Sequence, residues 1–123
     1  MKLKTKNIGD ITVIELAGRM TVDNIYSLTK LIERNVFPFT GKIEDSAEKS
    51  NSRVILDMEG VEAIDSSGLG TLLFLAKKCR ALGGDLKIVS IPPGAKSVFK
   101  IVRFDKIFHV FNSLDDAVKS YRL

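Results

Sequence analysis

Short β-branched runs alternate with amphipathic segments along this chain, and that alternation restricts its fold more than any other feature. The β-branched runs predict strands at Leu3–Ile8, Ile11–Leu16, Arg53–Asp57, Leu86–Ile91 and Ile107–Phe111. Apolar residues spaced by three and four predict helices that begin near Thr21–Asn24, Ser66, Pro92 and Ser113. Strands that alternate with single helices favour a mixed, mostly parallel sheet with crossover helices, so the predicted fold is α/β, with about five strands and about four helices.

The composition is that of one globular domain. The chain has 123 residues, of which 45% are hydrophobic and 28% charged, a balance typical of a single folded unit. No apolar run approaches the roughly 20 residues that a membrane-spanning helix needs, and the lysine-rich N-terminus lacks the apolar core of a signal peptide. Cys79 is the sole cysteine, so no internal disulfide can form. We therefore expect one domain over residues 1–123, in the cytoplasm.

The net charge of +4 does not by itself predict a polyanionic partner. The lysines are scattered along the chain and interleaved with acids, and no basic stripe or aromatic ladder stands out. We expect a solvated surface with no direct nucleic-acid binding and no membrane binding.

Residues 36–52 interrupt the alternation. They contain two phenylalanines around a proline and then a polar run rich in Glu, Ser, Lys and Asn. Such a segment cannot bury enough apolar area to offset its ordering entropy, so a long mobile surface loop is predicted.

The beginning of the second predicted helix carries the most informative residues. Asp65 follows a buried strand and a connection, and its carboxylate can accept a hydrogen bond from a free N–H of the first helical turn, as an N-cap does. Ser66 and Ser67 then lie in that first turn, followed by Gly68. Serines also suit helix entry without any further role, and the residues alone leave this alternative open.

Projection of this helix at about 100° per residue separates two faces. The expected core face contains Leu69, Leu72, Leu73, Ala76 and Cys79, and the opposite stripe contains Ser67, Gly70, Thr71, Phe74 and Lys78. Glycine inside a helix costs about 1 kcal/mol relative to alanine. We expect this cost at Gly70 to be compensated by a close contact that only glycine allows, either with a partner or with the chain's own sheet. The stripe is interpreted as a contact surface for a partner.

The sequence Asp-Ser-Ser-Gly-Leu-Gly at residues 65–70, after a Val-Ile-Leu-Asp strand, resembles the sulfate transporter and anti-sigma factor antagonist (STAS) family. Within it the chain is most similar to the bacterial anti-sigma factor antagonists. The likeness covers nearly the whole chain, including Gly18-Arg19 as a turn after the second strand. It implies a non-enzymatic domain that binds a serine protein kinase, which is also an anti-sigma factor, and thereby frees a sigma factor. It further implies that the kinase phosphorylates Ser67 and breaks the complex, and that a metal-dependent serine phosphatase restores it.

The resemblance also indicates what surrounds the phosphorylation site. Asp65, Ser66 and Gly68 shape it, and where the family usually has an acid this chain has Thr21, with Asp23 two positions later. A phosphoryl group adds about −1.5 to −2 charges, which a helix N-terminus accommodates. Phosphorylation is therefore expected to act at the surface, with almost no internal rearrangement.

Other chemistry finds less support in the residues. Gly68 and Gly70 begin a dinucleotide fingerprint, but Leu73 replaces its third glycine, and no Walker-type motif occurs. His109 has no companion for a metal site and is interpreted as structural, like Cys79 on the core face. No nucleophile, base and orienting partner stand together. We expect no catalytic activity, no cofactor and no metal. The remaining alternative is a constitutive STAS scaffold or transporter-complex subunit that phosphorylation does not control.

Overall fold

The computed structural model describes residues 1–35 and 53–122, so the predicted loop at residues 36–52 lies outside the described residues. The strands are β1 (Lys2–Ile8), β2 (Ile11–Met20), β3 (Arg53–Ile64), β4 (Asp85–Val89) and β5 (His109–Phe111). The helices are α1 (Ile25–Asn35), α2 (Ser66–Ala81), α3 (Pro93–Ile101), α4 (Phe104–Ile107) and α5 (Leu114–Arg122). None of these helices, within the ranges given, has both the length and the apolar character needed to cross a membrane.

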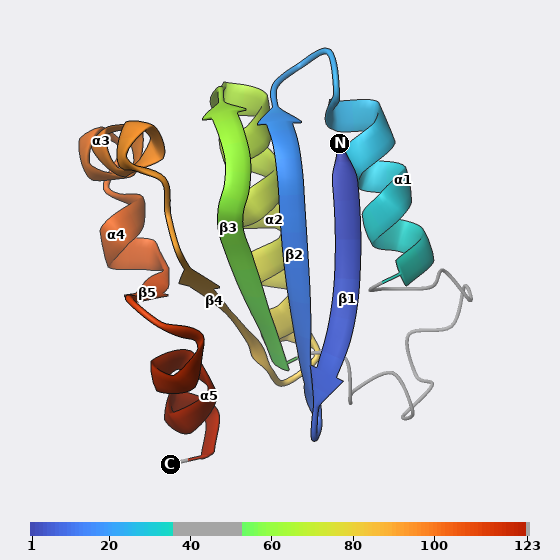
Figure 1. Cartoon of the computed structure of the whole chain (residues 1–123), viewed down its shortest axis with the longest axis vertical. Coiled ribbons are helices and arrows are strands. Elements are labelled where there is room, and N and C mark those ends of the chain that lie inside the picture. The colour runs from blue at the N-terminus through green and yellow to red at the C-terminus, as the bar shows by residue number, and fades with distance from the viewer. Residues whose placement is uncertain (36–52, 123) are drawn as a thin grey trace.

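The strands form one mixed sheet in which they lie in chain order, β1-β2-β3-β4-β5 (Figure 1). β1 and β2 pair antiparallel as a hairpin, and Gly9 in their turn has a φ of +61°, which glycine adopts readily. The other neighbouring strands are parallel. The predicted α/β class and the five-stranded, mostly parallel sheet are confirmed, and the one-turn helix α4 adds to the four predicted helices.

Two hydrophobic clusters cover the two faces of the sheet. The larger one joins the inner faces of α1, α2, α3 and α4 to the sheet, with Leu28, Leu72 and Phe99 among its buried residues. The smaller one joins α5 to the opposite face through Ala117 and Val118. The helices therefore lie on both sides of the sheet, and the chain ends with the single helix on the less covered face.

The second and third strands are longer than predicted. Gly18 and Arg19 do not form a turn, because they lie within β2, and β3 runs to Ile64 with no separate connection before Asp65. The parallel pairing of β2 with β3 continues past two register irregularities, and Gly18 at one of them has a φ of +117°. The added ends of the two strands contain exposed polar residues, so the pattern of apolar residues did not predict them.

The last two strands are shorter than predicted. β4 ends at Val89, directly before Ser90, whose φ of +60° breaks the extended backbone. Ile107 belongs to α4 and not to β5, because the rings of Phe104 and Phe108 pack together at 5.2 Å and hold this segment as a helical turn.

The end of α2 and the start of α5 have the hydrogen bonds typical of helix termini. Gly83 follows the end of α2 with a φ of +93°, and the Gly84 N–H donates to the Cys79 carbonyl oxygen at 2.9 Å. Ser113 Oγ accepts from the Asp116 N–H at 3.1 Å at the start of α5, which is half of a capping box. Cys79 is fully buried, as predicted from its place on the core face of α2.

Candidate docking and modification site

The site begins where β2 and β3 end side by side. Met20 and Ile64 are partners in the parallel ladder, so the residues that follow each strand meet at the same edge of the sheet. The Asp65 N–H donates to the Met20 carbonyl oxygen at 3.1 Å and joins the two connections. A Cβ atom on Gly68 would lie 2.3 Å from that same oxygen and 2.7 Å from Ile64 Cγ1. Glycine is therefore needed at position 68 for α2 to begin this close to the strand ends.

Asp65 is the N-cap of α2, as predicted. Its Oδ1 accepts from the N–H groups of Ser67 at 2.9 Å and Gly68 at 3.2 Å. Its Oδ2 accepts from the N–H of Val22 at 2.9 Å, in the connection between β2 and α1. The bond from Val22 is the main cause of a lowered pKa for Asp65, and the two first-turn N–H groups lower this pKa further. Partial burial and the negative charge of Asp23 act in the opposite direction and raise it.

Thr21 and Asp23 lie in the connection that Asp65 holds. Thr21 is buried, and its Oγ1 donates to Asp23 Oδ1. That hydrogen bond is the main cause of a lowered pKa for Asp23, with its own backbone N–H and the charge of Arg19 contributing. Asp23 follows Val22, whose N–H donates to Asp65, and the charge of Asp23 raises the pKa of Asp65. An acid is thus held beside the helix start although Thr21 occupies the usual acidic position.

Ser67 lies at one end of a groove between α1 and α2. The groove has a volume of about 640 Å³, and the predicted stripe on α2 forms one of its walls. Ser67 itself is partly exposed, and Phe74 is 60% exposed further along the same wall. The α2 residues that line the groove are Ser67, Gly70, Thr71, Phe74, Leu75 and Lys78.

The α1 wall was not predicted from the sequence. It contains Ile25, Thr29, Ile32 and Glu33, which lie three and four positions apart on one side of α1. Its apolar members also contact the core: Ile32 belongs to the larger hydrophobic cluster, and Ile25 packs against it. Helical spacing would have identified the stripe, but only the packing of α1 against α2 reveals that it faces Phe74 across a groove.

The contacts within the stripe differ from one residue to the next. Thr71 Oγ1 donates to the Ser67 carbonyl oxygen at 3.0 Å, and the Lys78 ammonium lies 5.9 Å from the centre of the Phe74 ring. A Cβ on Gly70 would have no atom within 4 Å, so close packing against the chain's own sheet does not explain this glycine. Leu73, which was predicted as a core residue, is half-buried and packs against the larger hydrophobic cluster, whereas Leu75, for which no core role was predicted, is buried. The helix is rotated slightly from the projected orientation.

A model of the STAS domain matches residues 2–117 of the chain. This chain belongs to the STAS domain family. Its relatives include a candidate anti-sigma factor antagonist, BtrV of Bordetella bronchiseptica, which is 31% identical over 88 residues that cover 72% of this chain and 76% of BtrV.

Solved STAS structures have the same fold. The crystal structure of a candidate anti-sigma factor antagonist of Thermotoga maritima has a TM-score of 0.82 at 19% identity, over 98% of this chain and 95% of that one. The phosphorylated form of the Bacillus cell fate determinant SpoIIAA has a TM-score of 0.64 at 17% identity, over 98% of this chain and 99% of that one. At these identities the similarity establishes the fold of this STAS domain.

Proposed function

We propose that this STAS domain is a cytoplasmic, non-enzymatic anti-sigma factor antagonist that phosphorylation of Ser67 switches off. In this proposal the unmodified protein binds an anti-sigma factor that is also a serine protein kinase, and so frees a sigma factor. The kinase then phosphorylates Ser67 and dissociates, and a metal-dependent serine phosphatase restores the active form. The relationship to BtrV and the phosphorylated form of SpoIIAA support this assignment.

The position of Ser67 in the groove is the observation that carries the proposal. A partner that packs on Phe74 and Gly70 also covers Ser67, because all three line the same groove. An exposed aromatic ring is a typical anchor of a protein interface, and a helical glycine with open space around it lets a partner's backbone approach. Docking and modification therefore compete for one surface.

The charges around Ser67 explain why phosphorylation would break the complex. The Ser67 and Gly68 N–H groups already donate to Asp65, so they are not available to a phosphate on the Ser67 side chain. A phosphoryl group would add about −1.5 to −2 charges beside Asp65 and Asp23. A partner covering this acidic end of the groove would have to remove water from all of these charges, and such desolvation is costly without a matching cation.

The test is a kinase assay with the cognate anti-sigma kinase and ATP, followed by mapping of the phosphate by mass spectrometry. We expect one phosphate on Ser67, none on Ser67→Ala, and an unchanged level on Ser66→Ala, which alters the neighbouring exposed serine. Phosphate incorporation that survives Ser67→Ala would refute the assignment of the site.

A binding assay separates the switch from the constitutive alternative. Ser67→Asp should bind the anti-sigma factor roughly tenfold or more weakly than the unmodified protein, because a buried charge without a partner is unfavourable at an interface. Ser67→Ala, which adds no charge, should bind as the unmodified protein does. Equal affinities for all three would favour a STAS scaffold or transporter-complex subunit that phosphorylation does not control.

A further inference from the structure

A second exposed apolar surface lies at the corner formed by α3, α4 and β5. Of the seven large hydrophobic side chains exposed in the described part of the chain, four lie between residues 101 and 110. They are Ile101 at 80% exposure, Val102 at 40%, Ile107 at 38% and Val110 at 40%. No role in the groove between α1 and α2 accounts for them, because none of them lines it.

The backbone of this corner is held firmly from inside. The Phe99 and Phe104 rings pack edge to face at 5.7 Å, and Phe108 packs on Phe104 at 5.2 Å. Arg103 between the two helices has a left-handed backbone with a φ of 59°, which turns the chain sharply from α3 into α4. The exposed apolar residues therefore belong to a fixed corner and do not result from a loose helix end.

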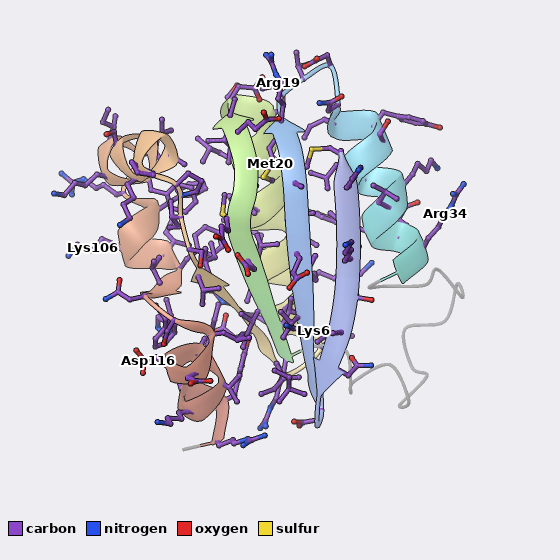
Figure 2. The ribbon with its side chains drawn as sticks, in the orientation of Figure 1. Lys6, Arg19, Met20, Arg34, Lys106 and Asp116 are labelled. Atoms are coloured by element: carbon purple, nitrogen blue, oxygen red, sulfur yellow. The ribbon has the colours of Figure 1, made fainter. Side chains whose placement is uncertain are left out.

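The same corner is basic. Lys96, Lys100, Arg103 and Lys106 are all exposed, and Asp105 is the only acid in the sequence between residues 93 and 111. Figure 2 shows Lys106 on the outer side of α4, away from the sheet. The exposed cations and the exposed apolar side chains thus lie close together along residues 96–110.

The shape of the corner indicates the kind of surface that it fits. A side chain that keeps 80% of its accessible area, as Ile101 does, has few neighbouring atoms around it and lies on a convex part of the molecule. Figure 1 shows α3 and α4 projecting at the β5 end of the sheet, on the other side of α2 from α1. A convex apolar tip with a basic rim is typical of proteins that rest on an anionic bilayer, with apolar side chains at the acyl boundary and Lys and Arg at the headgroups.

We propose that this corner, defined as residues 93–107 together with Val110, binds reversibly to the surface of membranes that contain anionic lipids. The expectation of no membrane binding considered the lysines of the whole chain, where acids are interleaved with them. Residues 93–107, by contrast, contain four cations and one acid. This surface is separate from the Ser67 groove, so the proposal holds or fails independently of the phosphorylation switch.

Co-sedimentation of the full chain with lipid vesicles tests this proposal. The unmodified protein should sediment with vesicles of phosphatidylcholine and phosphatidylglycerol, should stay in solution with phosphatidylcholine alone, and should be released by added salt. Ile101→Asp and the double variant Lys100→Glu with Lys106→Glu should each reduce the bound fraction about tenfold or more. All altered side chains are exposed, so circular dichroism should show an unchanged fold.

Matched controls separate this surface from general charge attraction. Lys2→Glu with Lys4→Glu makes the same change in net charge on the exposed lysines of β1, and Val22→Asp puts an acid at another apolar side chain that is 71% exposed. Both controls should bind vesicles nearly as well as the unmodified protein. Absence of binding to the anionic vesicles, or equal losses in the β1 control and the α3–α4 variant, would overturn the proposal. Such results would leave an acidic protein as the partner to seek for this corner.

Discussion

At the scale of single residues, two glycines that lie two positions apart in α2 have opposite surroundings. Gly68 has backbone and side-chain atoms within 3 Å of where a Cβ would lie, whereas Gly70 has nothing within 4 Å. The sequence motif contains both glycines and cannot distinguish them. The difference arises from the closeness of Met20 in β2, which is 48 positions away from Gly68 in the chain (68 − 20).

The two glycines make a matched pair of substitutions. Gly68→Ala should destabilise the protein by about 2 kcal/mol or more, because its methyl group would collide with backbone and not with a flexible side chain. Gly70→Ala should instead stabilise it by up to about 1 kcal/mol, through improved helix propensity. Urea unfolding followed by circular dichroism measures both changes. Equal effects of the two substitutions would contradict the packing described for α2.

The Asp65 carboxylate should make stability depend on pH. Its pKa is lowered in the folded protein from an ordinary value of 3.8, so its contribution is complete above that value and is lost as the pH falls through the folded pKa. Asp65→Asn keeps a hydrogen-bond acceptor without this titration. The difference in unfolding midpoint between the unmodified protein and Asp65→Asn should therefore shrink as the pH falls below about 3.8. If the difference in unfolding midpoint stayed constant with pH, the three N–H groups would not be stabilising the negative charge of Asp65.

At the scale of elements, the sequence predicts most clearly those helices and strands that have one apolar face. The spacing of apolar residues predicts α2 almost to its ends, and the cap at Asp65 predicts where it begins. The ends of β2 and β3 were missed because they carry polar residues such as Arg19, Glu59 and Glu62. Pairing with a strand that is distant in the chain holds these ends in place, and a local sequence pattern cannot predict such pairing.

Tyr121 of helix α5 makes several polar contacts with the sheet. Tyr121 Oη lies 2.6 Å from the Asp85 carbonyl oxygen and accepts from the Val54 N–H at 3.2 Å. The Lys87 ammonium lies 4.0 Å from the centre of the same ring and donates to Ser120 Oγ at 2.6 Å. This polar contact sits beside the small apolar cluster of that face, so α5 depends on it for its position.

Removal of the tyrosine hydroxyl should therefore cost stability. Tyr121→Phe should lower the free energy of unfolding by about 1 kcal/mol, because the Val54 N–H and the Asp85 carbonyl lose a partner while the ring remains over Lys87. Tyr26→Phe removes a hydroxyl from a ring that is 73% exposed and should change stability little. Urea unfolding of the two variants provides the comparison. A neutral Tyr121→Phe would show that water replaces the hydroxyl at α5.

At the scale of the whole molecule, the sequence predicted the class of fold and the stripe of α2 that forms one wall of the groove. It could not predict the α1 wall or the bond from Val22 to Asp65, because both depend on where the end of β2 lies relative to β3. The motif at residues 65–70 is local, but the site also needs the connection after β2. The hydrogen bond from Val22 to Asp65 joins these two segments, and its partners are 43 residues apart in the chain.

Phosphorylation of Ser67 should change the structure of the rest of the molecule little. Phosphorylation adds charge at the open end of a groove and breaks none of the three bonds to Asp65, so backbone amide shifts should change only near residues 21–24 and 65–74. NMR spectra of the two forms, assigned residue by residue, measure this. Shift changes spread over β4, β5 and α5 would indicate an internal rearrangement.

The order of the strands has a consequence for how the protein is made. Because each strand pairs with the one before it in the chain, every new strand that leaves the ribosome meets a neighbour that has already been synthesised. The N-terminal hairpin forms the template, and no strand has to wait for a later one to fill a gap beside it. Assembly during translation can therefore proceed in one direction, with the elements around Ser67, α1, β3 and α2, synthesised before β4, β5 and α5.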